Sequence, residues 1–95
     1  MSPALANDRF VTSVMEDQRK ANIIGDRVRE ARLKAKPSIT QEDLVARLQV
    51  QGLEYMDQAK ISRIESGTRP VYDYEVVQLA RALGVSVNWL LSEQN

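Results

Sequence analysis

The residues best suited to chemistry lie in the stretch 58–67, QAKISRIESG, where polar side chains recur at helical spacing. At about 100° per residue, Ile61 and Ile64 fall on one side of a helix and predict its buried side. The outward residues are small or polar; they are Gln58, Ala59, Lys60, Ser62, Arg63 and Ser66. Arg can pair with O6 and N7 of guanine, and Gln can do the same with N6 and N7 of adenine, in a groove about 12 Å wide. A solvated surface face has the same pattern, so this stretch alone does not separate the two interpretations.

Composition excludes most other chemistry. The 95 residues contain no Cys and no His, which removes the thiol nucleophile, the commonest general base and the commonest metal ligand. We therefore expect no enzyme activity, no metal, no cofactor and no small-molecule site. Thirteen basic and thirteen acidic residues give zero net charge, so charge alone does not indicate a nucleic-acid partner. No apolar run approaches the roughly 20 residues of a membrane span and no signal-peptide pattern opens the chain, which predicts a cytoplasmic protein.

The elements that must position the polar face are predicted to be helices throughout. Apolar spacing predicts helices within residues 22–36, 40–48, 58–66, 74–83 and 86–91. Their predicted N-caps are Thr40 (with Asp43 completing a capping box), Asp57, Asp73 and Ser86. Gly67 and Gly84 sit where a helix commonly ends on a left-handed residue.

An additional amphipathic helix is predicted ahead of these, between Asp8 and Ala21. Its apolar residues are Phe10, Val11, Val14 and Met15. We divide the chain into residues 1–22, a leader with a helix that could serve as an arm, and residues 23–95, the principal domain. The stripe could fold back on that domain or pack on a second chain, and we favour a partner-dependent arm because the domain core is complete without it.

Three ordered segments, TQEDLVARL, ISRIESG and LARALGVSVNWLL, resemble the helix-turn-helix domains of phage repressor (Cro/C1) or XRE-class transcriptional regulators. The resemblance covers about residues 23–91 and implies an all-α, five-helix, lambda-repressor-like domain, here with an extra N-terminal helix. It implies that the stretch 58–66 is the recognition helix. The implied contacts to DNA bases come from Gln58, Ala59, Lys60, Ser62 and Arg63, and those to phosphates from Thr40, Gln41 and Arg69.

The resemblance implies two further contacts, one within the chain and one between chains. Arg32 and Glu65 match positions that form an ion pair between the first helix and the recognition helix, a structural role. The last helix, with Trp89, Leu90 and Leu91, matches a common location for a dimer contact, although a lone Trp in a small domain is as often a buried anchor.

One departure from the family pattern concerns the turn of the motif. Eight residues, Gln49 to Met56, separate the two helices of the motif, where a turn of about 3–4 residues is usual. Either the scaffold helix is longer, or the loop bulges and returns Tyr55 or Met56 to the core. The longer connection leaves the angle of the recognition helix open, because a tight turn is what normally fixes it.

The resemblance implies a sequence-specific regulator that binds double-stranded DNA, with an expected role as a repressor dimer on an inverted-repeat operator. The alternative, favoured by the zero net charge and the long connection, is a protein-interaction module on the same fold with weak or no DNA binding. Salt dependence separates them, because binding through several phosphates weakens steeply as salt rises.

Overall fold

The computed structural model describes residues 20–92, which fold into helices joined by loops, with no strand among them. The helices are α2 (Gly25–Lys34), α3 (Gln41–Val50), α4 (Gln58–Ser66), α5 (Asp73–Leu83) and α6 (Val87–Leu91). The predicted all-α, five-helix domain is therefore confirmed. Within this part of the chain, no helix has the length and apolar character needed to cross a membrane.

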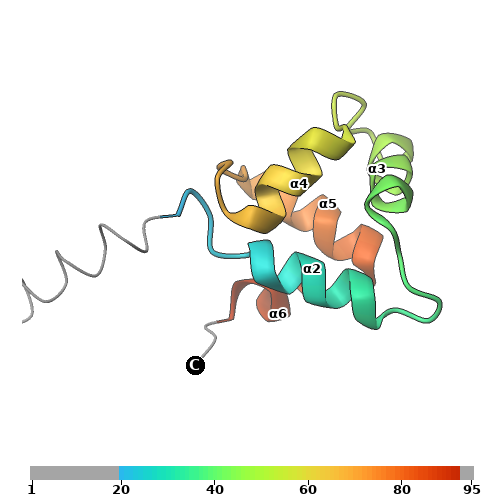
Figure 1. The fold of residues 1–95 in the computed structure, drawn as a ribbon, viewed down its shortest axis with the longest axis horizontal. Coiled ribbons are helices and arrows are strands. Elements are labelled where there is room, and N and C mark those ends of the chain that lie inside the picture. The colour runs from blue at the N-terminus through green and yellow to red at the C-terminus, as the bar shows by residue number, and fades with distance from the viewer. Residues whose placement is uncertain (1–19, 93–95) are drawn as a thin grey trace, which may run out of the picture.

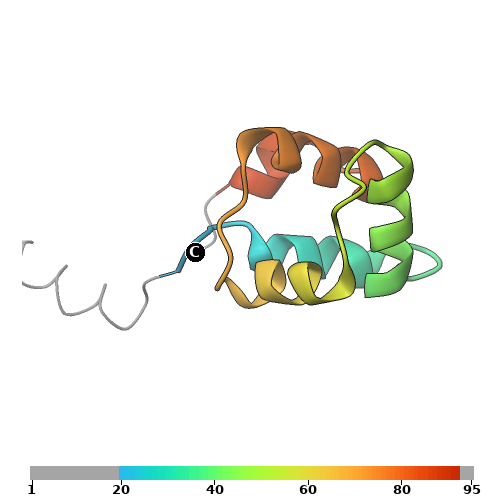
Figure 2. The same cartoon turned by 90° about the horizontal axis from the view of Figure 1, so that it is seen from above.

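The helices form two layers closed at one end. In Figure 2, α2 and α4 lie along one side, α5 and α6 along the other, and α3 runs between the layers at the end of the domain. Figure 1 shows α4 and α3 beside each other, as the two helices of the predicted motif should be. Side chains from every helix meet between the layers; those with no exposed surface include Val28, Leu44, Leu48, Ile61, Ile64, Leu79 and Leu90.

The helix ends follow the predicted capping residues with one exception. The side chains of Thr40, Asp57 and Ser86 accept hydrogen bonds from backbone N–H groups in the first turns of α3, α4 and α6. Gly67 ends α4 with φ 84°, in the left-handed region predicted for it. The prediction of Asp73 as an N-cap is wrong, because Tyr72 occupies that position and Asp73 is already helical.

The long connection adopts both of the predicted solutions. Helix α3 continues to Val50, beyond the predicted end at Leu48. The loop then returns to the core, where Leu53 and Met56 are 7% and 1% exposed. The amide of Gln49 donates to the carbonyl of Met56 at 2.9 Å, which ties the end of the loop to α3. The extra residues therefore add to the core rather than leaving a loose loop.

The helix predicted for residues 8–21 lies outside the described residues, apart from Lys20 and Ala21, which are not helical. Ala21 donates its backbone N–H to the carbonyl of Gly67 at 2.8 Å, so the chain enters the domain beside the end of α4.

Gly25, the first residue of α2, lies so close to the backbone of α4 that a larger side chain does not fit there. A Cβ atom at this position would lie 2.3 Å from the carbonyl oxygen of Ile64 and 2.8 Å from that of Glu65. Glycine to alanine in a helix normally stabilises by about 0.5–1 kcal/mol, but overpacking against backbone costs about 1–3 kcal/mol. We therefore expect Gly25→Ala to lower the midpoint of thermal unfolding. A raised midpoint would show that the two helices separate at little cost.

Candidate nucleic-acid interface

The outward face of α4 is open to solvent along its length. Ile61 and Ile64 have no exposed surface, which confirms the predicted buried side. On the other side Gln58, Ala59, Ser62 and Arg63 are exposed, and Lys60 is half-buried. The narrow apolar stripe thus leaves most of the helix surface to polar side chains that can bond to another molecule.

The two cations of this face differ in how freely they can bind an outside group. Lys60 Nζ lies 3.1 Å from a carboxylate oxygen of Asp57, the residue that also caps the helix. The guanidinium of Arg63 makes no hydrogen bond or ion pair with any residue between 20 and 92. Arg63 is therefore the cation of α4 best placed to form a new bidentate contact.

The side chain of Gln41 connects Gln58, on the exposed face of α4, with Glu65 in the last turn of the same helix. Its amide nitrogen donates to Glu65 at 3.1 Å, and its amide oxygen accepts from Gln58 at 3.3 Å. Gln41 is therefore oriented from two sides and holds the Gln58 side chain at the first turn of α4. The predicted phosphate contact and a predicted base contact are neighbours in space.

The beginning of α3 carries acidic groups beside its exposed N–H groups. Thr40 and Asp43 form the predicted capping box, with side chain to backbone bonds in both directions. The backbone N–H of Thr40 and its hydroxyl lower the pKa of the Asp43 carboxyl, so this group is ionised at neutral pH. Glu42 adds a second charge. A phosphate bound at this terminus would gain from the helix dipole and be opposed by these carboxylates.

The predicted ion pair between Arg32 and Glu65 is confirmed. Arg32 donates from Nε and Nη2 to the two carboxylate oxygens at 2.7 and 2.9 Å, and from Nη1 to the carbonyl of Ile39 at 3.0 Å. The side chains of the pair are 10% and 7% exposed. Hydrogen bonding to Glu65 raises the pKa of Arg32. This pair joins α2 to the last turn of α4.

Asn22, which sequence reasoning missed, fastens the same region. Its Nδ2 donates to the carbonyls of Ile64 and Arg69, and its Oδ1 accepts from the backbone N–H groups of Ile24 and Gly25. One amide therefore holds together the start of α2, the end of α4 and the loop beyond it. A single Asn ahead of a helix is the only sequence signal, and it does not reveal the second set of partners.

Arg69 has a different partner from the predicted phosphate. Its two terminal nitrogens lie 3.0 and 3.2 Å from the carboxylate oxygens of Glu75, and its side chain is 16% exposed. Glu75 has no exposed surface. An arginine held by a buried carboxylate has its charge largely neutralised, so we leave Arg69 out of the interface.

Glu75 is the second residue that sequence reasoning missed. Its carboxylate also accepts from the hydroxyl of Tyr55, in the long connection, and from the backbone N–H of Tyr72. Burial pushes the pKa of Glu75 upward, but the hydrogen bonds from Arg69, Tyr55 and Tyr72 outweigh it and the pKa lies below its ordinary value. Burial and the bond to Glu75 raise the pKa of the Tyr55 hydroxyl, which stays a donor.

The last helix divides the three residues predicted for a dimer contact. Leu90 has no exposed surface and belongs to the core of its own chain, so its side chain is not available to a second chain. Trp89 is half-buried, with the guanidinium carbon of Arg27 4.4 Å from its ring centroid. Leu91 is 42% exposed. Only Trp89 and Leu91 retain surface for a partner.

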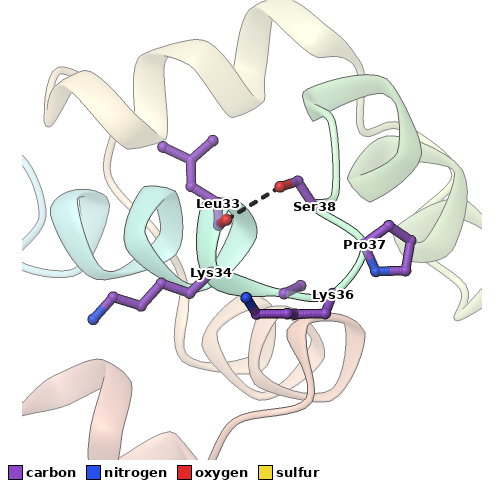
Figure 3. A pocket seen from close by; sticks show the side chains of 6 residues that line it. Leu33, Lys34, Lys36, Pro37 and Ser38 are labelled. Carbon is purple, nitrogen blue, oxygen red and sulfur yellow. Dashed lines mark hydrogen bonds between the residues drawn. The ribbon is translucent and has the colours of Figure 1, made fainter.

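An open hollow lies beside the loop that joins α2 to α3. Figure 3 shows Lys34 extending from the end of α2 and Lys36 from the loop, while the Ser38 hydroxyl donates to the carbonyl of Leu33. Lys34 pairs with Glu30 at 2.8 Å. Among the described residues, no side-chain atom lining this hollow is both buried and without a hydrogen-bond partner.

A family model described as a helix-turn-helix domain matches residues 23–90. That range contains α2 to α5, all of α6 but Leu91, and the other candidate contacts discussed above. Comparisons with curated proteins and with solved structures gave no match.

Proposed function

Because the chain belongs to the helix-turn-helix domain family, we propose that it is a sequence-specific regulator that binds double-stranded DNA through α4. The observation that carries the proposal is the exposed face of α4. It presents the guanidinium of Arg63, which has no partner among residues 20–92, the amide of Gln58 held by Gln41, and small side chains, with no apolar bulk to obstruct a groove. In this proposal α4 enters the major groove and α3 lies across the backbone.

Each side chain of the interface has a proposed role. Arg63 and Gln58 read bases, the first as a donor pair suited to guanine and the second suited to adenine. Lys60, Ser62 and Ala59 complete the surface that faces the groove. Thr40 and Gln41, at the start of α3, position the backbone phosphates.

We propose further that the protein acts as a dimer on an inverted-repeat operator and represses by occupying a promoter. One small recognition helix buries too little surface for tight specific binding, and such domains commonly pair across half-sites about one helical turn apart. Of the three residues of α6 predicted for this contact, Trp89 and Leu91 are the two that retain exposed surface.

The test is a titration of labelled duplex DNA with wild type and Arg63→Ala. A preferred duplex is first selected with wild type from a random-sequence pool, and binding to it is compared with binding to random duplex at several salt concentrations. We expect Arg63→Ala to lose about 1–3 kcal/mol of binding to the selected duplex and to relax the preference at one base pair. Arg81→Ala, which removes an exposed arginine from α5, serves as the matched control and should bind as wild type does.

A protein-interaction module is the second candidate. It is favoured by the carboxylates of Glu42 and Asp43 beside the proposed phosphate site, and by the zero net charge of the chain. If wild type shows no salt-dependent binding to random duplex at low salt, this alternative replaces the DNA proposal.

A further inference from the structure

Helix α4 is held by little apolar surface of its own. Its nine residues include only two buried side chains, Ile61 and Ile64. A short helix with so narrow an apolar stripe depends on the rest of the fold for its orientation. The segments that enter and leave α4 therefore have a strong influence on where its exposed face points.

The entering segment is residues 51–57, which comprises the non-helical part of the long connection and Asp57, the N-cap of α4. Its hydroxyl-bearing residue, Tyr55, is 45% exposed, so the ring contributes limited burial. The hydroxyl, however, donates to Glu75 on α5. This bond attaches the connection to a different helix from the two that it joins, just ahead of the residue that caps α4.

The leaving segment is attached to the same carboxylate. Arg69 follows the end of α4 by three residues and bonds Glu75 through both terminal nitrogens, at 3.0 and 3.2 Å. The backbone N–H of Tyr72 adds a bond at 3.0 Å. The two chain segments that flank α4 thus converge on one carboxylate with no exposed surface.

This convergence explains how a connection too long for a tight turn can still fix a helix. Burial opposes ionisation of Glu75, but its hydrogen bonds hold its pKa below the ordinary value, so the acceptor remains charged. A hydrogen bond to a buried charged group is strong and directional. Moving either end of α4 would stretch a bond to this group.

We propose that Tyr55 is a positioning residue for DNA reading: its bond to Glu75, shared with Arg69, sets the orientation of the recognition helix in place of a tight turn. The proposal rests on the function proposed above. Removing the hydroxyl should loosen the entering segment, which keeps its buried Leu53 and Met56 and the bond from Gln49, while Arg69 still holds the leaving segment. The helix should then tilt about its C-terminal end, and side chains of its first turn, Gln58 above all, should lose their alignment with base edges.

The first arm of the test needs no DNA. The chain has no Cys, so Ser62→Cys on α4 and Arg81→Cys on α5 can carry a pair of spin labels without background. We expect one narrow distance distribution in the otherwise wild-type chain and a broader or shifted one in Tyr55→Phe. Tyr72→Phe is the matched control, because it removes the hydroxyl of another exposed tyrosine and keeps the backbone N–H that donates to Glu75. It should leave the distribution unchanged.

The second arm measures DNA reading in the unlabelled proteins. The ratio of affinity for the selected duplex to affinity for random duplex should fall about tenfold in Tyr55→Phe, the order expected for one lost hydrogen bond to a charged group. The salt dependence of binding to random duplex should stay as in wild type, because it reports phosphate contacts. A variant that had merely lost stability would show reduced active protein in both titrations but an unchanged ratio.

The outcomes separate this proposal from the one on which it rests. If wild type binds no DNA, the proposed function fails, and the distance measurement still decides whether Tyr55 orients α4. An unchanged distance distribution in Tyr55→Phe overturns the positioning role. A changed distribution with a wild-type affinity ratio overturns the link between that position and DNA reading.

Discussion

Replacing Glu65 with alanine is expected to lower the free energy of unfolding by about 3–5 kcal/mol, because it leaves the buried charge of Arg32 without its partner. Arg32 is 8% exposed and would keep only its bond to the carbonyl of Ile39. Gln41 would lose an acceptor in the same step. Since the free energy of unfolding of a small domain is about 5–15 kcal/mol in total, the loss removes a large part of its stability. Thermal unfolding followed by far-UV circular dichroism measures it.

Two companion variants make this result interpretable. Glu65→Gln keeps the shape and an acceptor oxygen but removes the charge, so its midpoint should lie between those of wild type and Glu65→Ala. Glu30→Ala breaks the pair with Lys34, which is open to solvent, and should change the midpoint little. If Glu65→Ala unfolds at the wild-type midpoint, Arg32 has found water or another acceptor, and the pair does not hold α2 to α4.

Short-range patterns in the sequence predicted the features that depend on neighbouring residues, namely the helix caps and the buried side of α4. The caps at Thr40, Asp57 and Ser86 each need only a short polar side chain immediately ahead of a helix, so the local sequence is sufficient to predict them. The buried side of α4 follows from Ile61 and Ile64 alone. The pair of Arg32 and Glu65 was reached through the family resemblance, since 33 positions separate them.

The parts that were missed depend on how the long connection folds. Tyr55 reaches Glu75 only because Leu53 and Met56 enter the core on either side of it, and no periodic pattern encodes that path. Glu75 itself reads as an acidic residue in the first turn of a helix, where exposure is the usual expectation. Its burial changes the interpretation of Arg69, which looks like a free loop cation as long as its partner is unknown.

The same reasoning gives Arg69→Ala a large and pH-dependent effect on stability. It removes both guanidinium bonds to a carboxylate with no exposed surface, so at neutral pH we expect a loss of about 3–5 kcal/mol in the free energy of unfolding. Urea unfolding at a series of pH values, with Arg81→Ala as the control for removing an exposed arginine, measures the loss and its pH dependence.

The direction of the pH effect follows from the change in the pKa of Glu75. In wild type that pKa is lowered, so the stability that Glu75 contributes is present above the pKa of an unfolded glutamate, about 4.3, and is lost as pH falls through the folded value. Without Arg69, burial dominates and the pKa should rise above the unfolded value. The variant then relieves its buried charge by binding a proton, so the gap between variant and wild type should be widest near pH 7 and shrink toward about pH 4.

If Arg69 instead binds phosphate, the expected results differ. Its removal then leaves stability unchanged at every pH and reduces by about one the slope with which the logarithm of DNA affinity falls with the logarithm of salt concentration. The two measurements together therefore assign Arg69 either to the anchor on Glu75 or to the DNA backbone.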